Sequence, residues 1–223
     1  MAGPEIVYAA METTEDAFLG GRLMVAQPKA GSRAGLDTVF LAASCSAAGG
    51  DHVLDAGSGS GIVGLLAACR IEGLRVTGVE IDAGLCALAK ANAARNGFGG
   101  QSEFIHGDLA GPAGALFAAG LAADSIDHAL ANPPFLTAGE ARLPPEPRLR
   151  RAHGAEPGDL ERWVKTMAAL VKPGGTMTMI HRADALGPIL RYCEGRFGAL
   201  SVYPLFPRHG EPASRVVVQA EGQ

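Results

Sequence analysis

The sequence predicts an α/β fold with a doubly wound, mostly parallel sheet of seven strands and a C-terminal antiparallel hairpin. Short apolar stretches alternate with helix-forming stretches along most of the chain. This alternation is typical of a parallel sheet that carries helices on both faces. The last two apolar stretches, 200–206 and 214–220, are joined by a turn rich in Gly and Pro, which indicates one antiparallel strand at or near an edge of the sheet.

Each element is predicted from its apolar pattern and from the residues that flank it. The expected strands are residues 52–57, 74–82, 102–108, 125–131, 176–181, 200–206 and 214–220. The expected helices are residues 37–48, 61–71, 83–97, 110–120, 158–171 and 183–196. Asp37 and Asp82 stand where they can cap the helices that follow them. The first 35 residues are Gly-rich with little periodicity, and no regular element is predicted there.

The composition indicates an ordered protein. A chain of 223 residues, 48% of them hydrophobic, is long enough to bury a core, so we expect a single domain over residues 1–223. The formal charge of −4 argues against a broad nucleic-acid-binding surface, but it is compatible with a local basic patch.

The four cysteines are scattered, with no Cys-x-x-Cys pair and no His at a metal-binding spacing. We therefore expect buried free thiols in a reducing cytoplasm, and no metal site. The first residues lack a basic segment followed by an apolar one, and no apolar run reaches the length of a membrane span. This pattern predicts no signal peptide, no membrane partner and a cytoplasmic location.

A glycine-rich loop follows the first predicted strand of the sheet, in "VLDAGSGSGIVG". Gly57, Gly59 and Gly61 let the backbone approach a ligand, and the helix that follows favours an anionic group. Glu80 ends the next strand, where a carboxylate can accept from both ribose hydroxyls. Because the stretch from Gly59 also matches G-x-G-x-x-G, the loop suits either S-adenosylmethionine or a nicotinamide or flavin dinucleotide.

Two further acids favour S-adenosylmethionine. Asp55 precedes the first glycine, where a carboxylate would repel a pyrophosphate but would suit a ligand with an ammonium group. Asp108 ends the third strand, where it can accept from an adenine amino group. In the alternative interpretation the glycines only form a tight turn, and Asp55 caps the following helix.

The stretch Asn132, Pro133, Pro134 and Phe135 follows the fourth predicted strand. The Asn132 side-chain oxygen and the rigid Pro133 carbonyl offer two acceptors, which match the two hydrogens of a planar NH2 group. Phe135 can stack on the ring that carries this nitrogen. These residues are the candidate catalytic set for methylating an exocyclic amine by alignment, without a metal or a covalent nucleophile. The alternative is a turn in which Asn132 caps the backbone.

Over residues 51–181 the chain resembles the class I S-adenosylmethionine-dependent methyltransferases, through "VLDAGSGSG", "GVEID", "GD" and "NPPF". The resemblance implies a Rossmann-like fold. It also implies that the methionine part of the cofactor contacts Asp55, Gly57, Gly59 and Gly61. By the same resemblance, Glu80 binds the ribose, Asp108 binds the adenine, and Asn132–Phe135 holds the target amine.

A narrower resemblance covers nearly the whole chain. "FLGGRLMVAQPKAGSRAGLDTVFLAAS" and "YPLFPRHGEPASRVVVQA" are similar to segments of the bacterial valine-tRNA anticodon-loop adenine-N6-methyltransferases. This resemblance implies that residues 1–36 cover the cofactor and that Arg33 and Asp37 contact it. Taken alone, Asp37 is a helix cap and Arg33 a surface cation. Phe135 departs from the pattern, because adenine-N6 and glutamine-N5 enzymes often have Tyr there and guanine-N2 enzymes acting on ribosomal RNA often have Phe.

Residues 136–157 are predicted to form a long substrate loop. The loop is locally basic and lies next to the predicted amine site, so RNA phosphates are an attractive partner. The candidate substrate-binding residues are Arg148, Arg150, Arg151, His181 and Arg182. The alternative is a solvated loop whose arginines pair with nearby acids.

The leading hypothesis is an enzyme that methylates an exocyclic amine of RNA, most directly adenine N6 in a tRNA. A guanine-N2 enzyme acting on ribosomal RNA, a glutamine-N5 enzyme acting on protein, an oxidoreductase and a cofactor-binding module without turnover are the alternatives. Trp163 falls at helical spacing with Leu160 and Met167, which predicts core packing rather than a stacking surface.

Overall fold

The computed structural model describes residues 11–30, 33–135 and 158–223. Its main sheet has the order β5-β4-β3-β6-β7-β9-β8. The strands are β3 His52–Ala56, β4 Arg75–Glu80, β5 Ser102–His106, β6 Ile126–Ala131, β7 Val171–Arg182, β8 Phe197–Leu205 and β9 Arg215–Gly222. The pairs from β5 to β7 are parallel, whereas β9 is antiparallel to both β7 and β8. The predicted Rossmann-like fold, with its C-terminal antiparallel hairpin, is confirmed.

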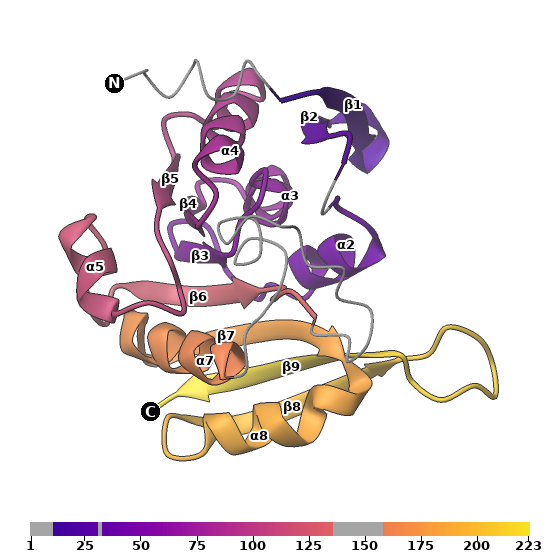
Figure 1. Ribbon diagram of the computed structural model, residues 1–223, viewed down its shortest axis with the longest axis vertical. Helices are drawn as coiled ribbons and strands as arrows, with labels where there is room; N and C mark the ends of the chain where they lie inside the picture. Colours follow the sequence, from indigo (N-terminus) through magenta and orange to yellow (C-terminus); the bar gives the residue numbers. More distant parts are fainter. Residues whose placement is uncertain (1–10, 31–32, 136–157) are drawn as a thin grey trace, which may run out of the picture.

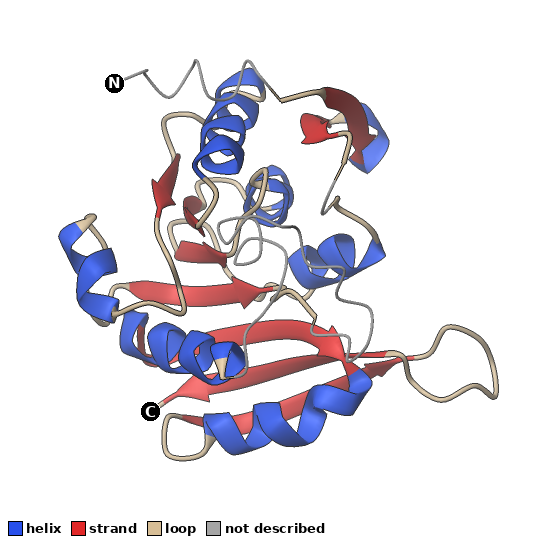
Figure 2. Ribbon diagram, viewed as in Figure 1, coloured by secondary structure: helices blue, strands red, loops and turns tan. Residues whose placement is uncertain are grey.

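Helices cover both faces of this sheet (Figures 1 and 2). They are α2 Leu36–Ala43, α3 Ile62–Arg70, α4 Ala83–Arg95, α5 Ala113–Ala118, α7 Asp159–Leu170 and α8 Leu186–Cys193. One buried apolar cluster joins the sheet to α2, α3 and α4, and a second joins it to α5, α7 and α8. Neighbouring residues of one strand divide between the two, since Val53 belongs to the first cluster and Leu54 to the second.

An N-terminal hairpin, absent from the sequence prediction, forms a separate two-stranded sheet. Its strands are β1 Thr13–Phe18 and β2 Leu23–Pro28, joined by the 3-10 turn η1 Leu19–Gly21. Two asparagines, one in α4 and one at its C-terminal cap, bind the edge of β2 as a neighbouring strand would. Asn92 bonds the amide and carbonyl of Ala26 at 2.8 and 3.0 Å, and Asn96 bonds those of Met24 at 2.9 and 2.7 Å. The hairpin is therefore docked on α4.

Several predicted boundaries move by a few residues. Asp82 caps α4 as predicted, because its Oδ1 accepts from the Leu85 amide at 2.9 Å. Asp37 does not cap α2: the helix starts at Leu36, and the cap residue is Gly35. Here the Asp37 carboxylate turns away from the helix end to pair with Arg215.

Candidate functional site

A cavity of about 1010 Å³ opens at the carboxyl ends of the central parallel strands. This volume is at the upper end of the range found for small-molecule sites. Gly57 and Gly59 line it after β3, Glu80 lines it at the end of β4, and Asp108 follows β5. Asn132 lines it directly after β6. The topology thus brings the chemically informative strand ends to one place, as expected for parallel strands.

The glycine loop makes a close approach to α7. Gly57 has a φ of +71°, and a Cβ atom built on it would lie 2.4 Å from Cη2 of Trp163. Trp163 packs against the apolar cluster beneath α7, as predicted, but it also lines the cavity. The prediction that Trp163 only packs in the core is therefore wrong in part. Gly59 has a φ of +54° and would meet nothing within 4 Å.

Asp55 and Gly61 lie outside the set of cavity-lining residues. Asp55 is buried, and its Oδ2 accepts from the Gly64 amide in the first turn of α3 at 2.8 Å. Burial raises the pKa of Asp55 to about 7. Gly61 precedes α3 with a φ of +84° and faces Phe104. In this structure Asp55 therefore braces the helix, which is the alternative that the sequence left open.

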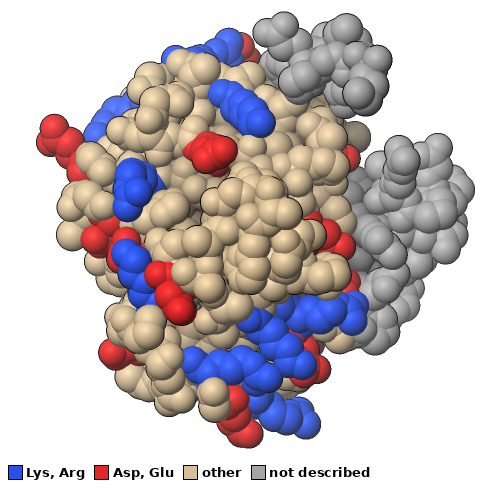
Figure 3. All heavy atoms as spheres, turned by 90° about the vertical axis from the view of Figure 1, so that its left-hand side faces the viewer, with Lys and Arg blue, Asp and Glu red and all other residues tan. Residues whose placement is uncertain are grey.

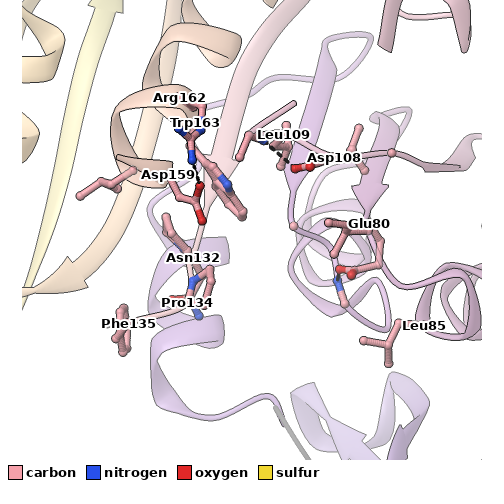
Figure 4. Close-up of a pocket in the computed structure, with 18 of the residues that line it drawn as sticks. Glu80, Leu85, Asp108, Leu109, Asn132, Pro134, Phe135, Asp159, Arg162 and Trp163 are labelled. Atoms are coloured by element: carbon pink, nitrogen blue, oxygen red, sulfur yellow. Dashed lines mark hydrogen bonds and ion pairs between the residues drawn. The ribbon is translucent and has the colours of Figure 1, made fainter. Parts of the chain in front are cut away.

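Glu80 and Asp108 lie together on one side of the cavity, opposite Asn132, Pro134 and Phe135 (Figure 4). Glu80 accepts from the amides of Gly59 and Asp82, at 2.8 and 2.9 Å. Burial raises the pKa of Glu80 above its ordinary value, and these amides oppose the shift.

Asp108 Oδ1 accepts from the Ala110 amide at 2.8 Å. Because a carboxylate has about four acceptor positions, both Glu80 and Asp108 keep positions for hydroxyl or amino hydrogens of a ligand.

The charges of the cavity wall are mainly negative. Its carboxylates are Asp37, Glu80, Asp108 and Asp159, and its guanidinium groups are Arg33 and Arg162. Arg33 pairs with Asp16 at 2.7 Å, and Arg162 pairs with Asp159. A pyrophosphate would meet an excess of carboxylates here, whereas a ligand with hydroxyls, an amino group and a cationic centre fits. The donors and acceptors of this wall therefore suit S-adenosylmethionine better than a dinucleotide.

The predicted catalytic set lines the cavity in full: Asn132, Pro133, Pro134 and Phe135. The Phe135 ring lies against two side chains from other strands. Its centroid is 4.7 Å from that of His181, at an interplanar angle of 71°, and 4.9 Å from Cζ of Arg215. Phe135 lies on the same side of the cavity as Asn132 (Figure 4).

The predicted substrate-binding residues divide into two groups. Arg148, Arg150 and Arg151, with the predicted loop 136–157, lie outside the described residues. His181 is buried at the end of β7 against Phe135, and it does not line the cavity. Arg182 pairs with Asp184 at 2.5 Å.

The start of α7 is one part of the site that sequence reasoning missed, and the segment 109–112 after Asp108 is another. Asp159, Leu160, Arg162 and Trp163 all line the cavity. The spacing of these residues places them on one face of a helix, and a sequence pattern can show this. The pattern does not show which turn of the helix reaches a ligand. The position of α7 after the predicted substrate loop is the signal that was available.

The cysteines are free thiols, and the part of the chain that the structure describes holds neither a metal-binding cluster nor a membrane-spanning helix. All four cysteines are free; Cys45, Cys86 and Cys193 are buried, and burial raises the pKa of Cys193 to about 11. Within residues 11–30, 33–135 and 158–223, no cluster of three or more His, Cys, Asp or Glu is arranged for a metal ion. In the same ranges no helix combines the length and apolarity needed to cross a membrane.

Comparisons with known proteins agree with this geometry. A family described as "Methyltransferase small domain" matches residues 23–144. A tRNA1(Val) (adenine(37)-N6)-methyltransferase of Porphyromonas gingivalis is 29% identical over 79% of this chain and 69% of its own. A release factor glutamine methyltransferase of Gloeobacter violaceus is 30% identical over 60% of this chain and 47% of its own.

Solved structures point the same way. A crystal structure of a predicted O-methyltransferase from Agrobacterium tumefaciens has a TM-score of 0.69 at 26% identity, covering 83% of this chain and 80% of its own. TrmN from Thermus thermophilus shares the fold, with a TM-score of 0.61 at 22% identity over 83% of this chain and 48% of its own. The chain belongs to the methyltransferase small domain family, and it is an enzyme that uses S-adenosylmethionine as its methyl donor.

Proposed function

We propose that this enzyme methylates an exocyclic amine of RNA, and most directly N6 of an adenine in a tRNA. The observation that carries the proposal is the stretch Asn132–Phe135 at the cavity edge, across from Glu80 and Asp108 (Figure 4). The similarity to tRNA adenine-N6-methyltransferases supports the same acceptor.

The chemistry of an aromatic amine explains how Asn132 and Pro133 can prepare the nitrogen for methyl transfer. The lone pair of such a nitrogen is delocalised into its ring, so the amine is a poor nucleophile. When the Asn132 side-chain oxygen and the Pro133 carbonyl accept both N–H hydrogens, they favour a pyramidal nitrogen with a directed lone pair. When bound, S-adenosylmethionine supplies an electrophilic methyl group on a sulfonium. Alignment of two reactants can contribute roughly 7–11 kcal/mol to lowering a barrier.

Phe135 supplies the second part of amine recognition. Its ring is half-buried at the cavity edge, where a flat base can stack on it. Base–aromatic stacking is worth about 1–3 kcal/mol per base. An unpaired base in an RNA loop reaches such a ring without leaving a duplex, which favours a loop base as acceptor.

A basic surface around α7 supports a nucleic-acid partner. Arg162, Lys165 and Arg196 surround Glu161 and lower the pKa of its carboxyl group, with the hydrogen-bonded Lys165 as the main cause. Arg191 is exposed on α8, which packs against α7. Lys and Arg side chains gather on the lower part of the face in Figure 3, at the height where Figure 1 draws α7 and α8. Such a cluster on an acidic protein suits RNA phosphates.

Two other acceptors remain candidates. A glutamine side chain also presents a planar NH2 group, and the similarity to release factor glutamine methyltransferases favours it. Guanine N2 is the third candidate, because Phe135 is the residue that guanine-N2 enzymes often carry.

Transfer of a labelled methyl group separates these candidates. The enzyme is incubated with methyl-labelled S-adenosylmethionine and either total RNA or total protein, and the product is digested and identified. N6-methyladenosine from tRNA supports the proposal, and methylglutamine from protein overturns it. Asn132→Ala is expected to lower turnover by about 100-fold or more while it still binds cofactor. Gln101→Ala, at a partly exposed position outside the cavity, is the control.

A further inference from the structure

Three segments far apart in the sequence meet at the Phe135 ring: the one that carries Phe135, the end of β7 and the start of β9. His181 is the last residue but one of β7, and Arg215 begins β9. These strand ends are paired, with His181 opposite Val216 and Arg182 opposite Arg215. His181 meets the ring edge-to-face at 4.7 Å, and Arg215 lies over the ring with Cζ 4.9 Å from the centroid. The paired ends of β7 and β9 therefore form a support for the ring.

Arg215 is itself held in place. Its Nε donates to Oδ2 of Asp37 at 2.8 Å, and its Nη1 donates to the Ser214 carbonyl at 3.2 Å. The side chains of Arg215 and Asp37 are 32% and 26% exposed, so solvent screens the pair less than a fully exposed one. A guanidinium anchored in this way keeps its position over an aromatic face, which attracts the cation through the ring quadrupole.

His181 packs edge-to-face against the ring as a neutral group. It is 7% exposed, and its Nδ1 has no hydrogen-bond partner among the described residues. Burial lowers its pKa, and the nearby charges of Arg182 and Arg215 act in the same direction, against the Arg182 backbone and Asp184. A neutral imidazole can pack against Phe135 without adding a second positive charge beside Arg215.

We propose that Arg215 is a positioning residue for methyl transfer, which holds the Phe135 ring in the orientation that receives the acceptor, with Asp37 fixing Arg215. Neither Arg215 nor His181 lines the cavity, so both act through the ring. Pro133 and Pro134 restrict the backbone before Phe135 but leave the side-chain torsions of the phenyl group free. In this proposal Asp37 helps to position the methyl acceptor rather than the cofactor. The proposal rests on the proposed function, in which Phe135 stacks on the acceptor.

A double-mutant cycle tests the coupling. Arg215→Met is expected to lower kcat by about tenfold, the effect of losing 1.4 kcal/mol, while the Kd for S-adenosylmethionine stays within twofold. In a Phe135→Leu background the same change is expected to have less than a twofold further effect, because the ring is already gone. An equal loss of kcat in both backgrounds overturns the proposal. Arg75→Met, at an exposed position of β4, is the control.

A charge exchange separates positioning from simple stabilisation. Asp37→Arg with Arg215→Asp can re-form the ion pair, but it places a carboxylate over the ring. We expect its Tm to recover relative to either single variant while kcat stays low. Recovery of kcat together with Tm overturns the proposal, since the ion pair alone would then be enough. If the methionine variant does not fold, Arg215→Lys takes its place. This variant keeps the charge, and we expect it to retain part of the activity.

The acceptor for these assays is whichever the wild-type enzyme methylates. If the wild type labels protein rather than RNA, the proposed RNA function fails, and the cycle is run on the protein acceptor. The result for Arg215 therefore does not depend on the identity of the acceptor.

Discussion

At the scale of single residues, the contact between Gly57 and Trp163 joins the glycine loop to α7. Gly57 and Gly59 both have positive φ, so alanine at either position is strained by about 1–2 kcal/mol. Only at Gly57 does the added Cβ also meet the Trp163 ring, at 2.4 Å. Overpacking of this kind costs about 1–3 kcal/mol. Gly57→Ala is therefore expected to lower the free energy of unfolding by about 1–3 kcal/mol more than Gly59→Ala, as measured by urea denaturation. Adding Trp163→Leu should remove this difference, and a persistent difference would contradict the contact.

Asp55 makes a prediction about pH. Its ordinary pKa is 3.8, and burial raises it to about 7 in the folded protein. Between these values the folded state keeps a proton that the unfolded state has lost, so this group's contribution to stability falls as the pH rises. From pH 5 to pH 7, the free energy of unfolding of the wild type should fall by about 2–3 kcal/mol relative to Asp55→Asn. Denaturant titration without added cofactor measures this difference. Parallel pH profiles for the two proteins would show that Asp55 is ionised in the fold, and Glu103→Gln, at an exposed position, is the control.

The strand-ending residues show how much of the site the sequence reveals. The sequence predicts one site for Glu80, Asp108 and Asn132, because parallel strands bring their carboxyl ends together, and all three line the cavity. Asp55 also lies near the end of a strand. The Gly64 amide in the first turn of α3 is buried and needs an acceptor, which the Asp55 carboxylate supplies. Which of two acceptable partners a carboxylate takes depends on packing in three dimensions, and a linear pattern does not contain that information.

At the scale of elements, the N-terminal hairpin depends on Asn92. This residue is 1% exposed and donates to the carbonyls of Ala26 and Ser60 while accepting from the Ala26 amide. Asn92→Ala leaves these backbone groups unpaired in the interior, at about 1–3 kcal/mol for each unsatisfied group. We expect a lower Tm and faster amide hydrogen exchange over residues 13–28 than in the wild type. Asn96→Ala is the matched control, because its bonds to Met24 are exposed and water can replace them.

The same hairpin shows where pattern reading fails. β2 is buried at nearly every position, and β1 alternates only weakly, so neither strand has the regular period of a half-buried strand. The outer edge of β2 is bonded instead by the side chains of Asn92 and Asn96, about 70 residues away in the sequence. A helix that acts as a strand partner leaves no signal within the segment itself, and the segment therefore looked irregular.

At the scale of the whole molecule, the directions of the strands follow from their connections. Alternating strands and helices require crossovers, and crossovers produce the parallel pairs from β5 to β7. The Gly- and Pro-rich stretch between β8 and β9 produces the antiparallel pair. The sequence did not predict that β9 inserts between β7 and β8, because a hairpin can join an edge through either of its strands. The insertion of β9 next to β7 places Arg215 beside Phe135, and it therefore determines which residues surround that ring.

The distribution of charge over the molecule makes a prediction about RNA binding. Lys165 on α7 and Arg191 on α8 are exposed, and both lie outside the residues that line the main cavity. If they bind phosphates, replacing both by alanine should weaken tRNA binding several-fold at about 50 mM salt and by less at about 200 mM. The slope of log K against log salt should fall by about 1 for each phosphate that the variant no longer neutralises.

Filter binding or fluorescence anisotropy across this salt range measures the slope. Lys29→Ala with Arg75→Ala removes the same net charge at exposed positions of β4 and beyond β2, and it should leave the slope within error of the wild type. Because net charge is matched, a lower slope in the α7–α8 variant alone locates the RNA-binding surface on this face. Equal slopes in both variants would mean that binding responds only to total charge and that α7 and α8 do not touch the RNA.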